Sequence, residues 1–127
     1  MNDGFTLALM VFCHIVDDYY LQGILAKMKQ KEWWRENTLN PMYRFDWVAA
    51  MAMHAFSWAF VIMLPWAIRC RFQPELIYFA FLAINAIAHF MVDNLKANHK
   101  MINLVSDQTA HLIQIFLTWV AMMEVLG

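Results

Sequence analysis

Charged residues are scarce in this sequence. Aspartate, glutamate, lysine and arginine make up 15% of the 127 residues, whereas 62% are hydrophobic and 16% are aromatic. Ordinary globular domains are about a quarter charged and about half apolar, so a water-soluble core of this size could not hide the apolar excess. The composition therefore predicts a protein whose natural solvent is the lipid bilayer.

Other shortages exclude further classes of protein. The net charge of -1 leaves no basic face of useful size for a nucleic-acid partner. Cys13 falls inside the first apolar run and Cys70 just past the second, so no disulfide is expected between them. The N-terminus lacks the basic region and cleavage site of a signal peptide, and no linker suggests a second domain. We therefore expect a single transmembrane domain over residues 1–127.

Four apolar runs are long enough to cross a bilayer, which takes about 20 residues per helix. These spans are predicted to run from about Phe5 to Leu25, from Trp47 to Ile68, from Leu76 to Leu95 and from Leu104 to Leu126. Between the first two, the lysines and tryptophans from Lys27 to Trp34 have the composition of a membrane interface and predict a short interfacial helix. The expected fold is all-α, an integral membrane four-helix bundle.

The cations are shared unequally between the two sides of the membrane. The loops after the first and third spans hold seven lysines and arginines, whereas the loop after the second holds only Arg69 and Arg71. By the positive-inside rule the side with seven cations is cytoplasmic. We expect a multi-pass protein of the inner (cytoplasmic) membrane with both termini outside the cytoplasm.

Histidine and aspartate recur inside the spans at a spacing of four residues, which places them on one face of a helix. They are His14 and Asp18 in the first span, His54 in the second, His89 and Asp93 in the third, and Asp107 and His111 in the fourth. With about 1.5 Å of rise per residue, one residue from each span falls in a single layer about 9 to 11 Å from the cytoplasmic end. The members of this layer are Asp18, His54, His89 and His111. The order also indicates a faint repeat of two hairpins, each supplying half of one site.

Ionisable groups inside a bilayer are costly unless they face the bundle interior and find partners. Imidazole and carboxylate together are usual ligands of zinc and also suit manganese and iron. We therefore expect one or two divalent ions, with zinc favoured, on Asp18, His54, His89, Asp93 and His111. His14 and Asp107 are candidates for further ligands or for the catalytic acid and base, and Gln22, Asn85, Lys96 and Gln108 for groups that support the ligands or orient a substrate. Of the doubled Asp17 and Asp18, the four-residue spacing favours Asp18 as the inward carboxylate.

These motifs together resemble the domain-of-unknown-function family 3307, which consists of small bacterial and phage-associated integral membrane proteins. The resemblance rests on His14-x3-Asp18-x3-Gln22, His54, His89-x3-Asp93-x2-Lys96 and Asp107-Gln108-x2-His111, and it covers nearly the whole chain. It implies a four-helix membrane fold and no particular activity. A more distant similarity, to predicted membrane-bound metal-dependent hydrolases, implies hydrolysis by analogy.

Three functions are compatible with this pattern. The leading hypothesis is a metal-dependent hydrolase that cleaves an ester or phosphoester, most naturally of a lipid, at the cytoplasmic headgroup layer. The second is a metal or proton permeation pathway, since chains of histidine and aspartate also serve as relays. The third is a non-catalytic protein in which the metal clamps four helices, as a homo-oligomer or bound to a partner membrane protein through the loop from Met28 to Asp46. His99, outside the spans, is expected to be a solvated loop residue.

Overall fold

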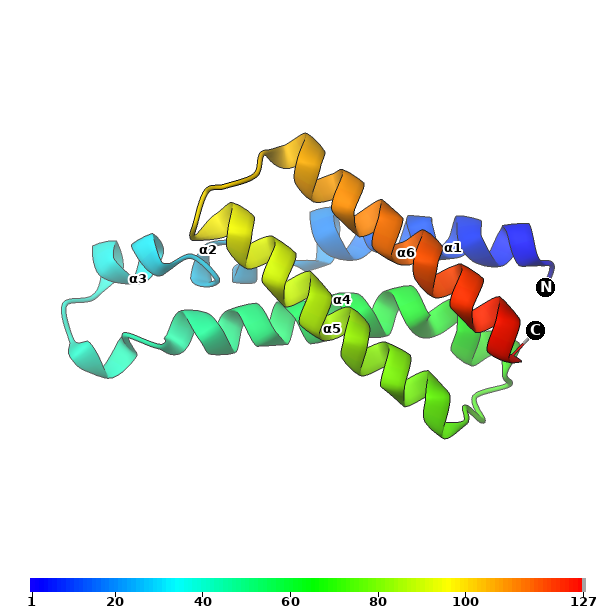
Figure 1. Ribbon diagram of the computed structural model, residues 1–127. Coiled ribbons are helices and arrows are strands. Elements are labelled where there is room, and N and C mark those ends of the chain that lie inside the picture. Colours follow the sequence, from blue (N-terminus) through cyan, green and yellow to red (C-terminus); the bar gives the residue numbers. More distant parts are fainter. Residues whose placement is uncertain (127) are drawn as a thin grey trace.

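The computed structural model describes residues 1–126, which are mostly helical and include no β-strand (Figure 1). The helices are α1 (Asp3–Ile15), the π-helix η1 (Val16–Leu21), α2 (Leu25–Met28), α3 (Lys31–Asn37), the 3-10 helix η2 (Pro41–Tyr43), α4 (Asp46–Arg69), α5 (Leu76–Ala97) and α6 (Leu104–Leu126). The predicted all-α fold, with four long helices, is confirmed.

The four long helices form a bundle. Helix α1 packs against α4 and α6, and α5 packs against the same two helices, so the order around the bundle is α1, α4, α5, α6. Both termini and the loop between α4 and α5 lie at one end, which we call the terminal end (Figure 1). Helices α2 and α3 and the loop between α5 and α6 lie toward the other, which we call the loop end.

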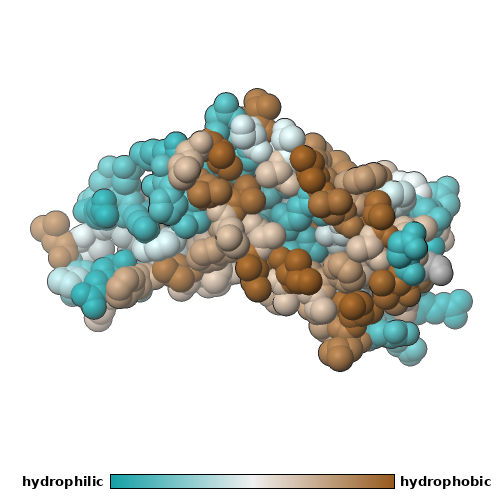
Figure 2. Space-filling view, in the orientation of Figure 1, coloured by the Kyte–Doolittle hydropathy of each residue, from teal (hydrophilic) through white to brown (hydrophobic). Residues whose placement is uncertain are grey.

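Four helical segments are long and apolar enough to cross a membrane: Asp3–Leu21, Pro41–Arg69, Leu76–Ala97 and Leu104–Leu126. Many of their large apolar side chains point away from the bundle, such as Phe12, Ile87 and Leu117, which are 60%, 63% and 61% exposed. Figure 2 shows hydrophobic residues along the bundle, with hydrophilic ones gathered mainly at its ends. An outer surface of this kind is suited to lipid, because water would penalise so large an apolar area.

The first span and the interfacial helix differ from the prediction. The span was expected to reach Leu25, but η1 ends at Leu21 and Gly23 then turns the chain with a φ of +56°. Glycine adopts this left-handed conformation without steric penalty, so it is suited to the break. The expected interfacial helix from Lys27 to Trp34 is two short helices, α2 and α3, because Gln30 between them has an extended backbone.

Asparagine side chains fix several of the helix junctions. The Asn2 carboxamide accepts a hydrogen bond from Phe5 N at the start of α1, and that of Asn103 accepts one from Ser106 N at the start of α6. Asn98 follows α5 and joins the α2–α3 junction to the bundle, since it accepts from Lys31 N and donates to Lys29 O. The two short helices are therefore held against the end of α5.

The apolar core fills the part of the bundle toward the terminal end. Its fully buried members include Met10 of α1, Trp58 and Trp66 of α4, and Ile115 and Met122 of α6. The polar residues that the sequence singled out lie mainly on the loop-end side of this core. The fold therefore positions one polar layer between an apolar core and the two short helices.

Candidate metal centre

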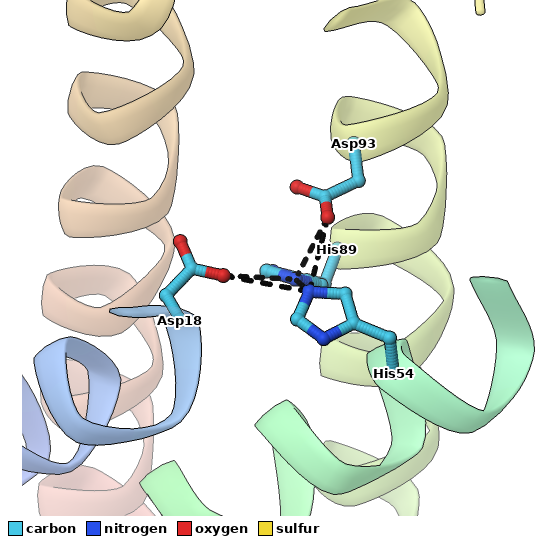
Figure 3. A group of neighbouring side chains, drawn as sticks. All are labelled: Asp18, His54, His89 and Asp93. Carbon is cyan, nitrogen blue, oxygen red and sulfur yellow. Dashed lines mark hydrogen bonds and ion pairs between the residues drawn. The ribbon is translucent and has the colours of Figure 1, made fainter. Parts of the chain in front are cut away.

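Side chains from three segments converge on one point in the interior of the bundle. Asp18 of η1, His54 of α4, and His89 and Asp93 of α5 point toward one another (Figure 3). Each offers one ligand atom, and these four atoms all lie within 4.8 Å of one another. A second group, Asp18, Asp107 and His111, meets the same criterion and brings in α6. The two groups share Asp18, so they are neighbouring parts of one polar layer.

The spacing of the ligand atoms in the first group suits a metal ion. The Nε2 atoms of His54 and His89 lie 3.0 Å apart. Asp93 Oδ2 lies 3.1 and 3.5 Å from these nitrogens, and Asp18 Oδ1 lies 3.4 and 3.9 Å from them. Four atoms placed tetrahedrally at about 2.1 Å from a zinc ion are about 3.4 Å from one another. The observed distances bracket that value.

The charge of the layer also favours a cation. The side chains of Asp17, Asp18, Asp93 and Asp107 are buried or nearly so, and they carry four negative charges when ionised. Two ammonium groups offset two of them: Lys29 Nζ lies 2.8 Å from Asp93 Oδ2, and Lys96 Nζ lies 3.3 Å from Asp107 Oδ2. The remaining negative charge equals the charge of one divalent ion, which would remove the cost of burying it.

Two buried carboxylate oxygens accept no hydrogen bond from the described residues, namely Asp17 Oδ2 and Asp107 Oδ1. Asp107 Oδ1 lies 3.2 Å from His111 Nε2, but this nitrogen makes its hydrogen bond with Asp93 Oδ1 at 3.1 Å. A buried acceptor without a donor costs about 1 to 3 kcal/mol, and more when it is charged. Asp107 Oδ1 is therefore free to take a cation or a proton.

His89 packs against two other rings. The Trp58 indole stacks on it with a centroid distance of 4.1 Å and an interplanar angle of 15°, and the His111 ring lies at a centroid distance of 4.2 Å. All three side chains are fully buried. The sequence analysis did not identify Trp58, although it follows His54 by four residues and so shares its helix face. The stacking fixes the plane in which His89 presents Nε2.

His14 lies beside the polar layer but outside both ligand groups. Its Nδ1 accepts a hydrogen bond of 2.8 Å from Trp58 Nε1, and because an indole can only donate, Nδ1 carries no proton. The proton is therefore on Nε2, which donates to Gln108 Oε1 at 2.8 Å. In this arrangement neither ring nitrogen is free for a metal. The role of His14 as acid, base or further ligand stays a prediction.

Gln108 continues this chain of hydrogen bonds toward the carboxylates. Its amide Nε2 donates to Asp18 Oδ2 at 3.1 Å and to Asp107 Oδ2 at 2.9 Å. Because its Oε1 is bound to His14, the amide cannot flip without losing three hydrogen bonds. Gln108 thus lies where the sequence predicted a supporting group, and it orients one carboxylate from each of two helices.

Both adjacent aspartates of η1 face the interior, although Asp18 was expected to be the inward one. Asp17 is 1% exposed and its Oδ1 accepts a hydrogen bond of 2.7 Å from Ser57 Oγ. A π-helix has more residues per turn than an α-helix, so its neighbouring side chains diverge by a smaller angle. The π-helix therefore allows two consecutive carboxylates to enter the same layer.

The other predicted supporting residues lie at different distances from this layer. Lys96 forms an ion pair with Asp107. The Gln22 side chain donates a hydrogen bond to Asp18 O, and the Oε1 atom of Gln22 is buried with no hydrogen-bond partner among the described residues. Asn85 belongs to a separate network, in which it accepts hydrogen bonds from Gln114 and Thr118. The sequence analysis did not predict Lys29, which reaches Asp93 only because the chain turns at Gly23.

The predicted repeat of two hairpins has a counterpart in the contacts. In the first half His54 of α4 approaches Asp18 at 3.4 Å, and in the second half His111 of α6 approaches Asp93 at 3.1 Å. The two remaining histidines, His14 in the first half and His89 in the second, have different surroundings. His14 hydrogen-bonds to Trp58 and Gln108, whereas His89 belongs to the four-residue ligand group. The two halves are thus similar in their aspartate–histidine contacts and have diverged elsewhere.

Comparison of the chain with protein-family models, with curated proteins and with solved structures finds no match. The resemblance to family 3307 therefore stays a prediction. The fold and the site define a helical bundle with membrane-type helices and a buried histidine–aspartate group able to hold a metal ion. Its function has to be inferred from that group.

Proposed function

We propose that this protein is a metal-dependent membrane hydrolase. The observation that carries the proposal is the convergence of two imidazole nitrogens and two carboxylate oxygens at ligand spacing in a buried layer. Histidine with carboxylate is a ligand set of catalytic zinc, which is the favoured ion, and manganese and iron accept the same ligands. The predicted similarity to membrane-bound metal-dependent hydrolases points in the same direction.

The proposed reaction is hydrolysis of an ester or phosphoester. The metal would be held by Asp18, His54, His89 and Asp93, and it would lower the pKa of a bound water molecule. Asp107 is suited to take the proton of the attacking water, because its Oδ1 accepts no hydrogen bond from the described residues. The water oxygen would form a bond with the carbonyl carbon or phosphorus of the substrate. The bond to the alcohol oxygen then breaks, and this oxygen takes up the proton. His14 is linked to Asp107 through Gln108 and is the second candidate for moving a proton.

The distribution of cations favours a substrate in the cytoplasmic leaflet. Seven of the nine lysines and arginines lie in the segments at the loop end, which the positive-inside rule assigns to the cytoplasm. In that orientation both termini lie outside the cytoplasm, and the membrane is the inner one. The polar layer is on the loop-end side of the apolar core, so a lipid headgroup would reach it from the cytoplasmic face.

A non-catalytic metal clamp is the second candidate, and one observation favours it. The two ligand groups draw on η1, α4, α5 and α6, so a metal bound there would tie the whole bundle together. The apolar core argues against the third candidate, a permeation pathway. Met10, Ile62, Met63, Ile115 and Met122 are fully buried between the polar layer and the terminal end, and these side chains offer no oxygen or nitrogen ligand to a proton or a hard divalent ion.

Metal analysis of the purified protein tests the proposal. Wild-type protein in detergent is expected to retain zinc or another divalent ion, the His89→Ala variant to lose most of it, and the His111→Ala variant to lose any second ion held by Asp18, Asp107 and His111. His99→Ala is the matched control, because this exposed histidine belongs to neither ligand group. One ion per chain would indicate the four-residue group alone, and two would place a second ion on Asp18, Asp107 and His111. Folded wild-type protein without metal would overturn the proposal.

A measurement of substrate turnover distinguishes the proposed hydrolase from the non-catalytic metal clamp. Metal-loaded protein is expected to release the alcohol or phosphate of a phospholipid in mixed micelles, and the chelated protein and His89→Ala to release none. If metal is bound and raises the unfolding temperature, but no phospholipid or carboxylic ester is cleaved with zinc, manganese or iron, the clamp is the correct function.

A further inference from the structure

A cavity of about 530 Å³ opens beside the candidate metal centre at the loop end. Its lining includes Gln22, Lys29, Gln30, Asp93, Lys96 and Lys100. Asp93 belongs to the four-residue ligand group, so the cavity borders one of the proposed metal ligands. Its volume is in the range of small-molecule sites, about 300 to 1,000 Å³.

Three ammonium groups make the cavity suitable for an anion, and each of them now contacts a carboxylate. Lys29 pairs with Asp93, Lys96 with Asp107 and Lys100 with Glu32, at 2.8, 3.3 and 3.0 Å. Lys29 is 12% exposed, whereas Lys96 and Lys100 are 38% and 62% exposed. Lys100 can therefore turn toward a ligand at little cost, whereas Lys96 and Lys29 are held by the buried carboxylates of Asp107 and Asp93.

The Lys29 contact competes directly with a metal. Lys29 Nζ lies 2.8 Å from Asp93 Oδ2, the oxygen that also approaches the Nε2 atoms of His54 and His89. A divalent ion bound to this oxygen would stand close to the ammonium group, and two cations repel each other strongly where little water screens them. Metal binding is thus expected to push the Lys29 ammonium away from Asp93 and into the cavity.

A second feature of the cavity also points to a ligand. Gln22 lines it, and the buried Oε1 of this residue has no hydrogen-bond partner among the described residues. Its Nε2 is already used, since it donates to Asp18 O at 3.0 Å. An acceptor left free beside three cations fits an anion that carries a hydroxyl group, because the hydroxyl can donate to the amide oxygen.

We propose that this cavity binds a phosphoryl group, and that the phosphoryl group and the metal strengthen each other's binding through Lys29. A phosphoryl group offers several acceptor oxygens and suits lysine, and its charge replaces the carboxylate partner that Lys29 loses to the metal. This inference rests on the proposed metal centre and names the phosphoryl class as its substrate. The same chemistry is present in a phospholipid headgroup and in a soluble phosphate ester.

The affinity for zinc, measured by competition with a chelating indicator in micelles of a detergent that contains no phosphate, tests the coupling. Adding glycerol phosphate is expected to tighten zinc binding on the order of tenfold, a usual size for coupling between two sites. Adding glycerol alone is the control for the hydroxyl groups. In a second arm, phosphatidic acid is added to the micelles instead of glycerol phosphate. An effect in the lipid arm alone identifies a headgroup site, and one in the soluble arm alone identifies a free phosphate ester.

The variant Lys29→Gln makes the test specific. Without phosphate it is expected to bind zinc more tightly than wild type, because no ammonium group competes for Asp93, and glycerol phosphate should no longer improve binding. Lys27→Gln is the matched control, since this exposed lysine lies on α2, just before Met28 and Lys29, and does not line the cavity. Circular dichroism establishes that each variant is folded.

Two outcomes overturn the inference while leaving the metal centre in place. One is zinc affinity in wild type that neither phosphate arm changes. The other is an enhancement in Lys29→Gln as large as in Lys27→Gln. Absence of zinc binding under every condition would instead overturn the proposed function.

Discussion

Trp58 and His14 share a hydrogen bond of 2.8 Å in which the indole is the donor. The same indole stacks on His89, so one side chain fixes both the tautomer of His14 and the plane of a candidate metal ligand. Among the described residues, Trp58 makes no hydrogen bond with a member of the four-residue ligand group. Its influence on the site is therefore exerted through two histidines.

Replacing Trp58 by phenylalanine separates these two effects. Trp58→Phe keeps an aromatic ring against His89 but removes the hydrogen-bond donor to His14 Nδ1. The His14 ring can then change its tautomer and its hydrogen bond with Gln108. Metal affinity is expected to fall on the order of tenfold, as for the loss of other groups that orient ligands. The measurement is zinc competition in detergent.

Trp66→Phe is the control for this substitution. Trp66 is also fully buried on α4, but its Nε1 has no hydrogen-bond partner among the described residues. The Trp66→Phe variant should bind zinc with the wild-type affinity. Equal affinities in the two variants would show that the indole hydrogen bond has no part in orienting the site.

Among the described residues, Asp17 Oδ1 accepts a hydrogen bond only from Ser57 Oγ of α4, at 2.7 Å. Ser57→Ala is expected to lower the free energy of unfolding by about 1 to 3 kcal/mol, because it leaves the Asp17 carboxylate buried without a partner. Adding Asp17→Leu should recover much of this loss, since an apolar pair has no unsatisfied group. Thermal and denaturant unfolding in detergent measure both. A double variant no more stable than Ser57→Ala would contradict the explanation.

Substituting Asn85 tests whether this residue serves only the structure of the bundle or also supports metal binding. Asn85→Ala removes the acceptor of Gln114 and Thr118 and is expected to cost about 1 to 2 kcal/mol of stability. Zinc stoichiometry and affinity should be unchanged, because these contacts do not include the histidine–aspartate layer. A loss of zinc in folded Asn85→Ala would instead support the role beside the metal that the sequence predicted for Asn85.

The proposed orientation can be checked with single cysteines. In a Cys13→Ala background, Cys70 after α4 should react with a membrane-impermeant maleimide from the outside of cells or right-side-out vesicles. In a background with Cys13→Ala and Cys70→Ala, the variant Leu39→Cys should react only in inverted vesicles, since position 39 is 96% exposed between α3 and α4. The opposite pattern would place the loop end outside and contradict a substrate in the cytoplasmic leaflet.

Much of the site could be predicted from spacing because it lies on regular helices. His89 and Asp93 are four residues apart on α5, and the structure brings them to 3.5 Å. The contact between His54 and Asp18 also follows from depth, since antiparallel helices bring residues of equal depth together. The helix ends of α5 and α6 agree with the apolar pattern within two residues.

The rest of the site depends on features that periodicity does not encode. Lys29 reaches Asp93 because the chain turns at Gly23 and Asn98 holds the following residues against α5. The inward position of Asp17 depends on a π-helix, for which no sequence pattern was available. Trp58 looked like an ordinary apolar residue, although its position four residues after His54 was a usable signal.

The π-helix η1 (Val16–Leu21) has a consequence for how such a site can arise. A π-turn is an α-turn with one additional residue, so this segment corresponds to a single-residue insertion into the first transmembrane helix. Removing one residue would restore the α-helix and rotate everything after it by about 100° relative to α1. Asp17 and Asp18 could not then both face Ser57 and His54. A one-codon insertion is thus sufficient to give an otherwise ordinary membrane helix a second interior carboxylate.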